Sequence, residues 1–402
     1  MFGWEFPPHN SGGLGVACYG LSKALSNENV HITFVLPQNV GVSPGFLKMV
    51  FAHVPRVSLR RVDSLLSPYI TSESYKNLRS KAGRSMYGWG LLEEVKRYAL
   101  EAQKIALEED FDLIHAHDWL SFLAGIEAKH ASGKPLITHV HATEFDRTGG
   151  HGVNQDVYNI EREGMHEADR VIAVSTFTKN VVTSEYGIPH EKVTVVHNGI
   201  NQDDYREALE KKDILALKKA GNHIVLFVGR ITLQKGPEYF LYAAKRVLEK
   251  LPNTYFIIAG SGDMEHKMVR LSAALGIAGK VRFAGFVRGD DLGMLYRSAD
   301  LYVLPSVSEP FGISPLESLV YGTPVLISRN AGVSEVLPHA LKVDFWDIDE
   351  MANKIAAVLM NPSLRKQLVK EGQREALAAT WKSAAEKCLA IYQSVMNKQA
   401  FQ

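Results

Sequence analysis

The stretch SEPFGISPLES, residues 308–318, holds two carboxylates, Glu309 and Glu317, with seven residues between them. Gly312 and a Ser-Pro pair lie between the two acids, just ahead of a predicted helix. Carboxylates accept hydrogen bonds from hydroxyl groups, and backbone amides at the start of a helix attract anions. We therefore expect the amides of residues 311–314 to meet an anionic leaving group, while Glu309 and Glu317 hold hydroxyl groups beside it.

Ordinary helix capping is an alternative explanation for part of this stretch. With Ser314 as the N-cap, Pro315 as the first helical residue and Glu317 as the third, the letters SPLE fit a capping box. That explanation accounts for Glu317 alone. It gives no reason for Glu309, or for a glycine at position 312.

Two basic residues follow another predicted strand. The stretch VGRITLQKG, residues 228–236, carries Arg230 and Lys235 on a loop beyond the carboxyl end of that strand. A guanidinium group forks to phosphate oxygens, and an ammonium group supplies a compact positive charge. We therefore expect these two residues to bind a diphosphate rather than to be solvated surface charges. Together with the two acids, this chemistry suits a nucleotide sugar.

Four histidines end two neighbouring predicted strands. The motifs HAHD and HVHATEFD place them in pairs, each on one face of its strand: His115 with His117, and His139 with His141. A metal site is one interpretation, but no cysteine or second carboxylate stands at ligand spacing in these motifs. We favour histidines that line a cleft or lie satisfied in the core, and one of them could contact a substrate at a strand end.

A glycine-rich turn stands near the start of the chain. HNSGGLGVACYG, residues 9–20, follows the strand-like MFGWEF and opens a helix. Its glycines let the backbone approach a ligand, and helix-start amides attract phosphate. Counted from Gly13, the dinucleotide-binding pattern G-x-G-x-x-G/A fails, because its last position is Cys18. A phosphate-binding P-loop is also absent: around the Gly-Lys pair of ASGKPL, residues 131–136, Ala128 stands in place of the first glycine and Pro135 in place of the Ser/Thr. We expect a turn that contacts a ligand rather than a plain strand–helix connection.

The triplet DID at 347–349 spells the D-x-D pattern with which metal-dependent sugar transferases hold a divalent cation. It directly precedes the helical run EMANKIAAVLM, where Asp349 suits an ordinary N-cap. We therefore assign no metal ligand to this chain, and we predict no metal and no cofactor.

Short apolar, β-branched runs alternate with longer helical ones, a pattern typical of doubly wound α/β domains with parallel sheets. The first series has predicted strands at 31–37, 111–117, 135–142, 170–175 and 192–198, with helices at 14–27, 92–108, 119–131 and 176–186. The second has strands at 223–230, 254–260, 280–287, 300–306 and 324–328, with helices at 237–250, 290–298 and 315–321. The polar stretch 200–222 between the two series is the candidate linker.

Length and composition agree with two soluble domains. The 402 residues exceed one ordinary core, and we place the domains at 1–200 and 201–380. A formal net charge of +1 gives no general attraction to nucleic acid or membrane. Two distant cysteines, Cys18 and Cys388, argue against a disulfide framework and fit a reducing cytoplasm. We find no signal peptide and no apolar run of membrane length.

One irregular stretch, residues 56–84, holds seven basic and two acidic residues. We interpret it as a solvated insertion. The alternative is a peripheral contact with an anionic membrane surface or acceptor.

The chain resembles the family 4 glycosyltransferases over almost its full length. The resemblance rests on the motifs SGGLG, HAHDWL, VHATEFD, ADRVIAVS, VHNGI, VGRITLQKG, SADLYVLPS and SEPFGISPLESLVYGTPV, the last of which holds the family's E-x7-E pattern. It implies the GT-B fold, with two Rossmann-like domains facing across a cleft and a final helix, 381–402, that crosses back to the first domain. It also implies retaining, metal-independent transfer from an α-linked nucleotide sugar.

The family's site residues carry over to matching positions of this chain. By this resemblance, Arg230 and Lys235 hold the diphosphate, Glu309 contacts the donor sugar and Glu317 contacts the nucleotide ribose. His141 matches the histidine near the reacting carbon. Backbone groups at Phe311, Gly312 and Ile313 line the sugar, those at Phe286 and Val287 border the base, and Gly13 lets the first loop approach the phosphates. Gly12 and Ser314 are further substrate-binding positions.

Donor and acceptor follow from weaker similarities. HATEFDRTGG resembles family members linked with α-glucan or glucosyl transfer, so transfer of glucose from a UDP- or ADP-sugar to a glycan such as glycogen is the main hypothesis. Asn10 replaces the lysine of the K-x-G-G-L loop, which argues against a bacterial glycogen synthase. The alternatives are a mannosyl- or hexosaminyltransferase of cell-envelope or lipid-linked glycans, a nucleotide-sugar epimerase, and a silent sugar-nucleotide binding module. Met1 falls inside the first predicted strand, which leaves open a natural start upstream.

Overall fold

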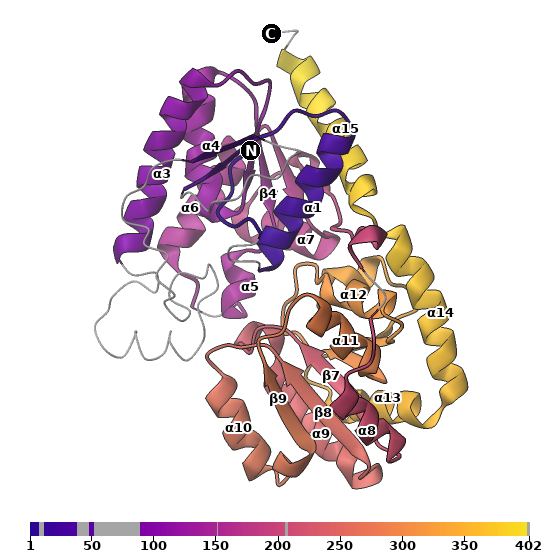
Figure 1. The fold of residues 1–402 in the computed structure, drawn as a ribbon. Coiled ribbons are helices and arrows are strands. Elements are labelled where there is room, and N and C mark those ends of the chain that lie inside the picture. Colours follow the sequence, from indigo (N-terminus) through magenta and orange to yellow (C-terminus); the bar gives the residue numbers. More distant parts are fainter. Residues whose placement is uncertain (8–11, 38–47, 52–88, 151, 206–207, 400–402) are drawn as a thin grey trace. The chain divides into compact units, whose positions relative to one another are not determined.

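The computed structural model describes the chain except for residues 8–11, 38–47, 52–88, 151, 206–207 and 400–402 (Figure 1). The basic stretch at 56–84 and Asn10 lie outside the described residues. The chain divides into two compact units. Unit 1 holds the described residues up to Gly199 together with those from Trp381 onward, and unit 2 holds Ile200–Thr380. Within the described part of the chain, no helix combines the length and apolarity that a membrane crossing requires.

Unit 1 is built on parallel strands. Four of them pair in the order β3 (Ile114–His117), β4 (Leu136–Val140), β5 (Arg170–Ala173) and β6 (Val193–Val195). Two more pair with each other, β1 (Thr33–Leu36) and β2 (Lys48–Phe51). Phe2 links the two groups through bridges to Val35 on β1 and Ala116 on β3. Every residue of β3 and β4 is buried, including the histidines that alternate with apolar residues in β3.

Helices complete unit 1: α1 (Gly13–Asn27), α3 (Trp89–Glu108), α4 (Trp119–Ser132), α5 (Glu144–Thr148), α6 (Gln155–Glu167), α7 (Thr176–Tyr186), the short η1 (His190–Lys192) and α15 (Trp381–Gln399). The last helix, α15, runs alongside α1 (Figure 1). Gly20 on α1 permits this close packing, because a Cβ there would lie 2.4 Å from the ring of Trp381.

Unit 2 holds a six-stranded parallel sheet. Its strands run in the order β12 (Leu341–Val343), β11 (Val325–Ser328), β10 (Leu301–Leu304), β7 (His223–Val228), β8 (Thr254–Ala259) and β9 (Val281–Gly285). Aromatic rings of Phe227, Phe240 and Phe256 pack against one another in its core. The winding direction reverses between β7 and β10, which makes this position the topological switch point of the sheet.

The helical elements of unit 2 precede, connect or follow these strands. They are η2 (Gln202–Asp204), α8 (Lys212–Lys219), η3 (Leu233–Lys235), α9 (Pro237–Lys250), α10 (Glu265–Ala274), η4 (Ala278–Lys280), α11 (Asp290–Ser298), α12 (Ser314–Val320), η5 (Gly332–Glu335), α13 (Ile348–Met360) and α14 (Pro362–Ala378).

Two local expectations are corrected. The stretch 200–222 is more than a linker, because α8 forms within it and buries Ile214. At α13 the N-cap is Asp347, whose side chain accepts a hydrogen bond from the Glu350 amide at 2.9 Å. Asp349 lies inside the helix and forms an ion pair with Arg246 at 3.3 Å.

Candidate active site

The switch point of unit 2 brings a base and an acid together. Lys235 follows β7 and Glu309 follows β10, the two strands at which the winding reverses. Lys235 Nζ donates a hydrogen bond to Glu309 Oε2. Ser306 Oγ donates to the same oxygen at 3.0 Å. Ligands of open α/β sheets bind beyond the carboxyl ends of the strands at this position, so the pair stands where a ligand is expected.

Backbone contacts fix the loop that carries Glu309. Its amide donates to the carbonyl oxygen of Asn330 at 2.9 Å, and its carbonyl accepts from the amide of Gly332 at 2.9 Å. Gly312 has a φ of +93°, a conformation that favours glycine. A Cβ at this position would lie 3.0 Å from Glu309 Cγ. The glycine therefore allows the loop to fold back over the acid.

Glycine packing also shapes the loop of Arg230 and Lys235. A Cβ at Gly260 would lie 1.9 Å from the carbonyl oxygen of Gly229, and a Cβ at Gly236 would lie 2.3 Å from that of Pro305. These close approaches hold the loop after β7 against its neighbours. Arg230 NH2 donates to Gln234 Oε1 at 3.3 Å, so the guanidinium is positioned from within the same loop.

The structure does not form the capping box that stood as the alternative explanation at α12. The helix begins at Ser314 with Ile313 as its N-cap, and no described side chain caps it. Instead, Ser314 Oγ bonds Tyr302 OH at 2.8 Å, and Glu317 Oε2 accepts from Tyr296 OH at 3.2 Å. Burial raises the pKa of Glu317, and hydrogen bonds from Tyr296 and Tyr205 offset part of that rise. Glu317 therefore belongs to a tyrosine-lined environment that sequence spacing could not reveal.

The backbone positions predicted beside the base and sugar also lie in unit 2. Phe286 and Val287 follow β9, and the Phe286 side chain is 66% exposed. Phe311 is buried, and its carbonyl accepts from the Val333 amide at 2.7 Å. This bond ties the loop before α12 to η5.

Gly12 and Gly13 stand at the start of α1 in unit 1. Gly12 is the N-cap, and a Cβ there would lie 3.1 Å from Glu5 Oε2. A Cβ at Gly13 would meet no described atom within 4 Å. The backbone at Gly13 is therefore open to approach, although residues 9–11 of the motif lie outside the described chain.

The four histidines form one buried, stacked group in unit 1. His115 Nε2 lies 3.3 Å from His139 Nδ1, and His117 Nδ1 lies 3.0 Å from His141 Nε2. Tyr392 of α15 bonds His115 Nδ1 at 2.7 Å. Burial lowers the pKa of all four rings, that of His141 to about 3. The imidazoles are therefore neutral at physiological pH.

Asp118 is a positioning residue that sequence reasoning missed. It adopts a φ of +59°, rare outside glycine, at the turn between β3 and α4. Its Oδ1 accepts hydrogen bonds from the amides of His141 at 2.6 Å and Ala142 at 3.3 Å. Burial raises the pKa of Asp118 to about 6 against the opposing effects of Arg147 and these amides. The carboxylate thus fixes the backbone that presents His141.

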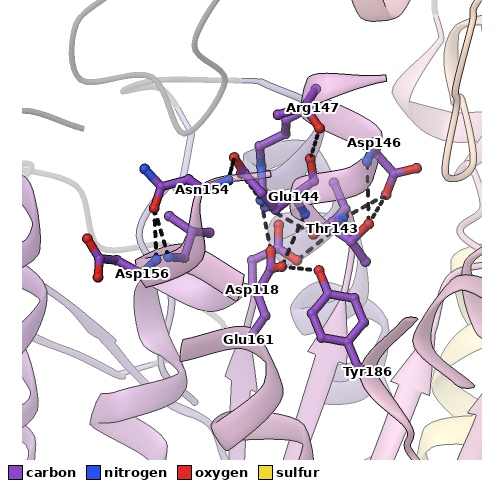
Figure 2. A network of polar contacts seen from close by, with 12 residues as sticks. Asp118, Thr143, Glu144, Asp146, Arg147, Asn154, Asp156, Glu161 and Tyr186 are labelled. Carbon is purple, nitrogen blue, oxygen red and sulfur yellow. Dashed lines mark hydrogen bonds and ion pairs between the residues drawn. The ribbon is translucent and has the colours of Figure 1, made fainter. Parts of the chain in front are cut away.

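A buried ion network supports the segment after β4, which carries His141 and Ala142 (Figure 2). Arg147 on α5 contacts Glu161 at 2.8 Å and Glu144 at 3.3 Å, and it donates to the carbonyl of Ala142 at 3.0 Å. Tyr186 OH donates to Glu161 Oε2. Burial raises the pKa of Glu161 to about 7, although Arg147 favours its ionised form. The network joins α5, α6 and α7 behind the end of β4.

Comparisons with known proteins identify the family and the class of fold. Residues 11–204 match the model of Glycosyltransferase Family 4, and residues 210–375 match that of Glycosyl transferases group 1. An uncharacterized glycosyltransferase of Methanocaldococcus jannaschii is 30% identical over 99% of this chain and 98% of its own. A glycogen synthase of Mycobacterium tuberculosis is 25% identical over 98% of this chain and 93% of its own. The crystal structure of Anabaena HepE with UDP and glucose superposes with a TM-score of 0.70 at 17% identity, covering 98% of each chain.

The chain belongs to the group 1, family 4 glycosyltransferases and has the GT-B class of fold, with two Rossmann-like parallel-sheet units. It is a glycosyltransferase, as the sequence predicted.

Proposed function

We propose that this glycosyltransferase moves glucose from UDP- or ADP-glucose to a glycan acceptor of the α-glucan type, with retention of configuration and without a metal or cofactor. The contact between Lys235 and Glu309 at the switch point of unit 2 carries the proposal. It pairs a phosphate-binding cation with a hydroxyl-binding acid at the position where α/β sheets hold nucleotides. The UDP and glucose in the HepE crystals and the similarity to a glycogen synthase support the donor and acceptor classes.

The hydrogen-bonding capacity of the pair fits this role. An ammonium group has three donors, so Lys235 can bind a phosphate oxygen while it keeps its bond to Glu309. Lys235 and Ser306 both donate to Oε2 of Glu309, and Oε1 accepts no hydrogen bond from the described residues. We assign Oε1 to a hydroxyl group of the donor sugar.

The mechanism follows from charge development. Cleavage of the sugar–phosphate bond leaves negative charge on the diphosphate, which Arg230, Lys235 and the amides of residues 311–314 stabilise. The departing phosphate oxygen takes the proton of the acceptor hydroxyl on the same face of the sugar, so the new bond keeps the original configuration. Glu317 holds the ribose hydroxyls, and Phe286 and Val287 border the base. In unit 1 we assign His141 to the reacting carbon, and Gly12 and Gly13 to the phosphates.

A donor panel tests the proposal. The full chain is incubated with UDP-glucose, ADP-glucose, UDP-GlcNAc and GDP-mannose, with and without glycogen, in a buffer that contains a chelator. Nucleotide release that requires glycogen and a glucosyl donor supports the proposal. Preference for GDP-mannose or UDP-GlcNAc points to an envelope or lipid-linked glycan, and conversion of the sugar without acceptor points to an epimerase.

The variant Glu309→Gln tests the role of the acid. The amide keeps the shape of the side chain but lacks the charge that orders Lys235 and accepts hydroxyl bonds. We expect turnover to fall on the order of 10²-fold. Unchanged turnover would show that Glu309 does not hold the donor sugar, and undetectable transfer by the wild-type chain with every donor would favour a silent binding module.

A further inference from the structure

A cysteine from another element reaches the histidine group of unit 1. Cys18 of α1, His117 of β3 and His141 after β4 place one ligand atom each within 4.8 Å of one another. Cys18 and His117 are fully buried, and His141 keeps 8% of its surface exposed. Their spacing along the chain does not suggest a ligand set, because helix α1 and the two strands come together only in the fold.

The ring nitrogens of this group are incompletely satisfied. His117 Nε2, His139 Nε2 and His141 Nδ1 are buried without a hydrogen-bond partner among the described residues. No choice of tautomers removes this shortfall, because each paired ring already uses its other nitrogen. An unpaired buried polar atom costs about 1–3 kcal/mol. The cluster therefore lacks partners that an additional bound species would supply.

The chemistry of the three side chains selects the kind of species. Neutral imidazole and thiolate are the ligands that zinc prefers, and their donor set is typical of tetrahedral sites. Two ring nitrogens of these side chains, His117 Nε2 and His141 Nδ1, have no hydrogen-bond partner among the described residues, so they are available as ligand atoms.

We propose that Cys18, His117 and His141 form a binding site for a divalent transition-metal ion such as zinc. Cys18 binds as the thiolate and releases its proton to solvent, and the two imidazoles bind as neutral ligands. Coordination of His141 removes it from the donor, so the ion inhibits sugar transfer. This inhibition rests on the proposed function, whereas binding of the ion does not.

Cobalt is the probe for this site, because a thiolate bound to Co²⁺ gives an intense charge-transfer band in the near ultraviolet. The full chain is freed of metal, titrated with Co²⁺ and then with Zn²⁺, and compared with Cys18→Ser and Cys388→Ser. Cys388 is the matched control, since it is also a buried cysteine of unit 1 but belongs to neither candidate ligand group. Circular dichroism verifies that each variant is folded.

We expect the wild-type chain and Cys388→Ser to show the band at one equivalent, to lose it to Zn²⁺, and to gain thermal stability with Co²⁺. Cys18→Ser should lack the band and bind Co²⁺ more than about tenfold more weakly. Absence of the band in the wild-type chain would overturn the proposal. So would a band unchanged by Cys18→Ser, because the thiolate would then belong to another cysteine. Co²⁺ that binds without the band points instead to His115, His117 and His139, the second candidate group, which offers no thiolate.

A transfer assay separates the two claims. If Co²⁺ gives the thiolate band but leaves the rate of transfer unchanged, the metal site stands and the assigned role of His141 fails. If the band and inhibition appear at the same concentration of Co²⁺, both are supported.

Discussion

The two units hold their charged groups in different ways. In unit 1 the side chains of Arg147 and Glu144 are 1% and 0% exposed, and their partners are other protein groups. In unit 2 the side chains of Lys235 and Glu309 are 15% and 8% exposed, at the open end of two strands. The first arrangement fixes backbone, and the second keeps hydrogen-bonding capacity for a ligand. Substitutions in the network of unit 1 should therefore lower mainly the free energy of unfolding, whereas substitutions at the pair in unit 2 should lower mainly turnover.

The largest effect on stability is expected at Arg147. Arg147→Met removes the cation between Glu144 and Glu161 and leaves buried carboxylates without compensation. We expect a loss of about 3–5 kcal/mol in the free energy of unfolding, measured by urea denaturation. The control is Arg246→Met, whose ion pairs lie on the surface and should contribute at most about 1 kcal/mol. Equal stability of the two variants would contradict a structural role for the network.

The largest effect on turnover is expected at the cations of unit 2. Lys235→Ala and Arg230→Ala should each lower turnover by on the order of 10²–10³, because each removes one preorganised donor to the leaving diphosphate. Lys250→Ala serves as control, since its exposed ammonium contacts only Asn353 among the described residues. Steady-state nucleotide release measures the effect. A fall of less than about tenfold in both variants would remove these residues from the mechanism.

The buried carboxylates of unit 1 should make stability depend on pH. The unfolded Glu161 carboxyl ionises near 4.5, whereas burial raises its pKa in the folded chain to about 7. Between these values the folded state retains a proton that the unfolded state has released, so stability falls as pH rises. The loss amounts to at most about 3 kcal/mol. Thermal unfolding measured across this pH range should show that the stability of Glu161→Gln falls less steeply with pH than that of the wild-type chain. The same slope for both chains would contradict the raised pKa.

A smaller, mixed effect is expected at Gly312. Gly312 has a φ of +93°, which strains an alanine at this position. The added Cβ would also lie only 3.0 Å from Glu309 Cγ, so Gly312→Ala displaces the acid. We expect a loss of about 1–3 kcal/mol in stability together with reduced turnover. Gly276→Ala separates the two causes, because Gly276 has a φ of +70° but open space around it. That variant should lose stability and keep full turnover.

The contrast between the units also explains what the sequence could predict. Strands such as β7 and β10 were found because buried parallel strands are apolar along most of their length. Lys235 and Glu309 were found because each lies in a distinctive local motif directly after a strand. Their mutual contact follows from the order of β7 and β10 in the sheet.

What the sequence could not predict depends on contacts between distant segments. Asp118 holds the amide of His141 across 23 residues, and Cys18 approaches the histidines only once α1 has packed on the sheet. The capping box failed for the same reason, because Tyr302 takes the hydroxyl of Ser314 that local spacing had assigned to the helix start. Local patterns identify candidate groups, whereas tertiary contacts decide what those groups bond.

Binding of a nucleoside and its diphosphate tests the central claim most directly. Calorimetry compares uridine with UDP, or adenosine with ADP if the donor panel selects it, in a buffer with a chelator. The wild-type chain should bind the diphosphate far more tightly, and the double variant Arg230→Ala, Lys235→Ala should lose that preference while its affinity for the nucleoside stays unchanged. A double variant that still prefers the diphosphate, or a wild-type preference that requires a divalent ion, would contradict the account.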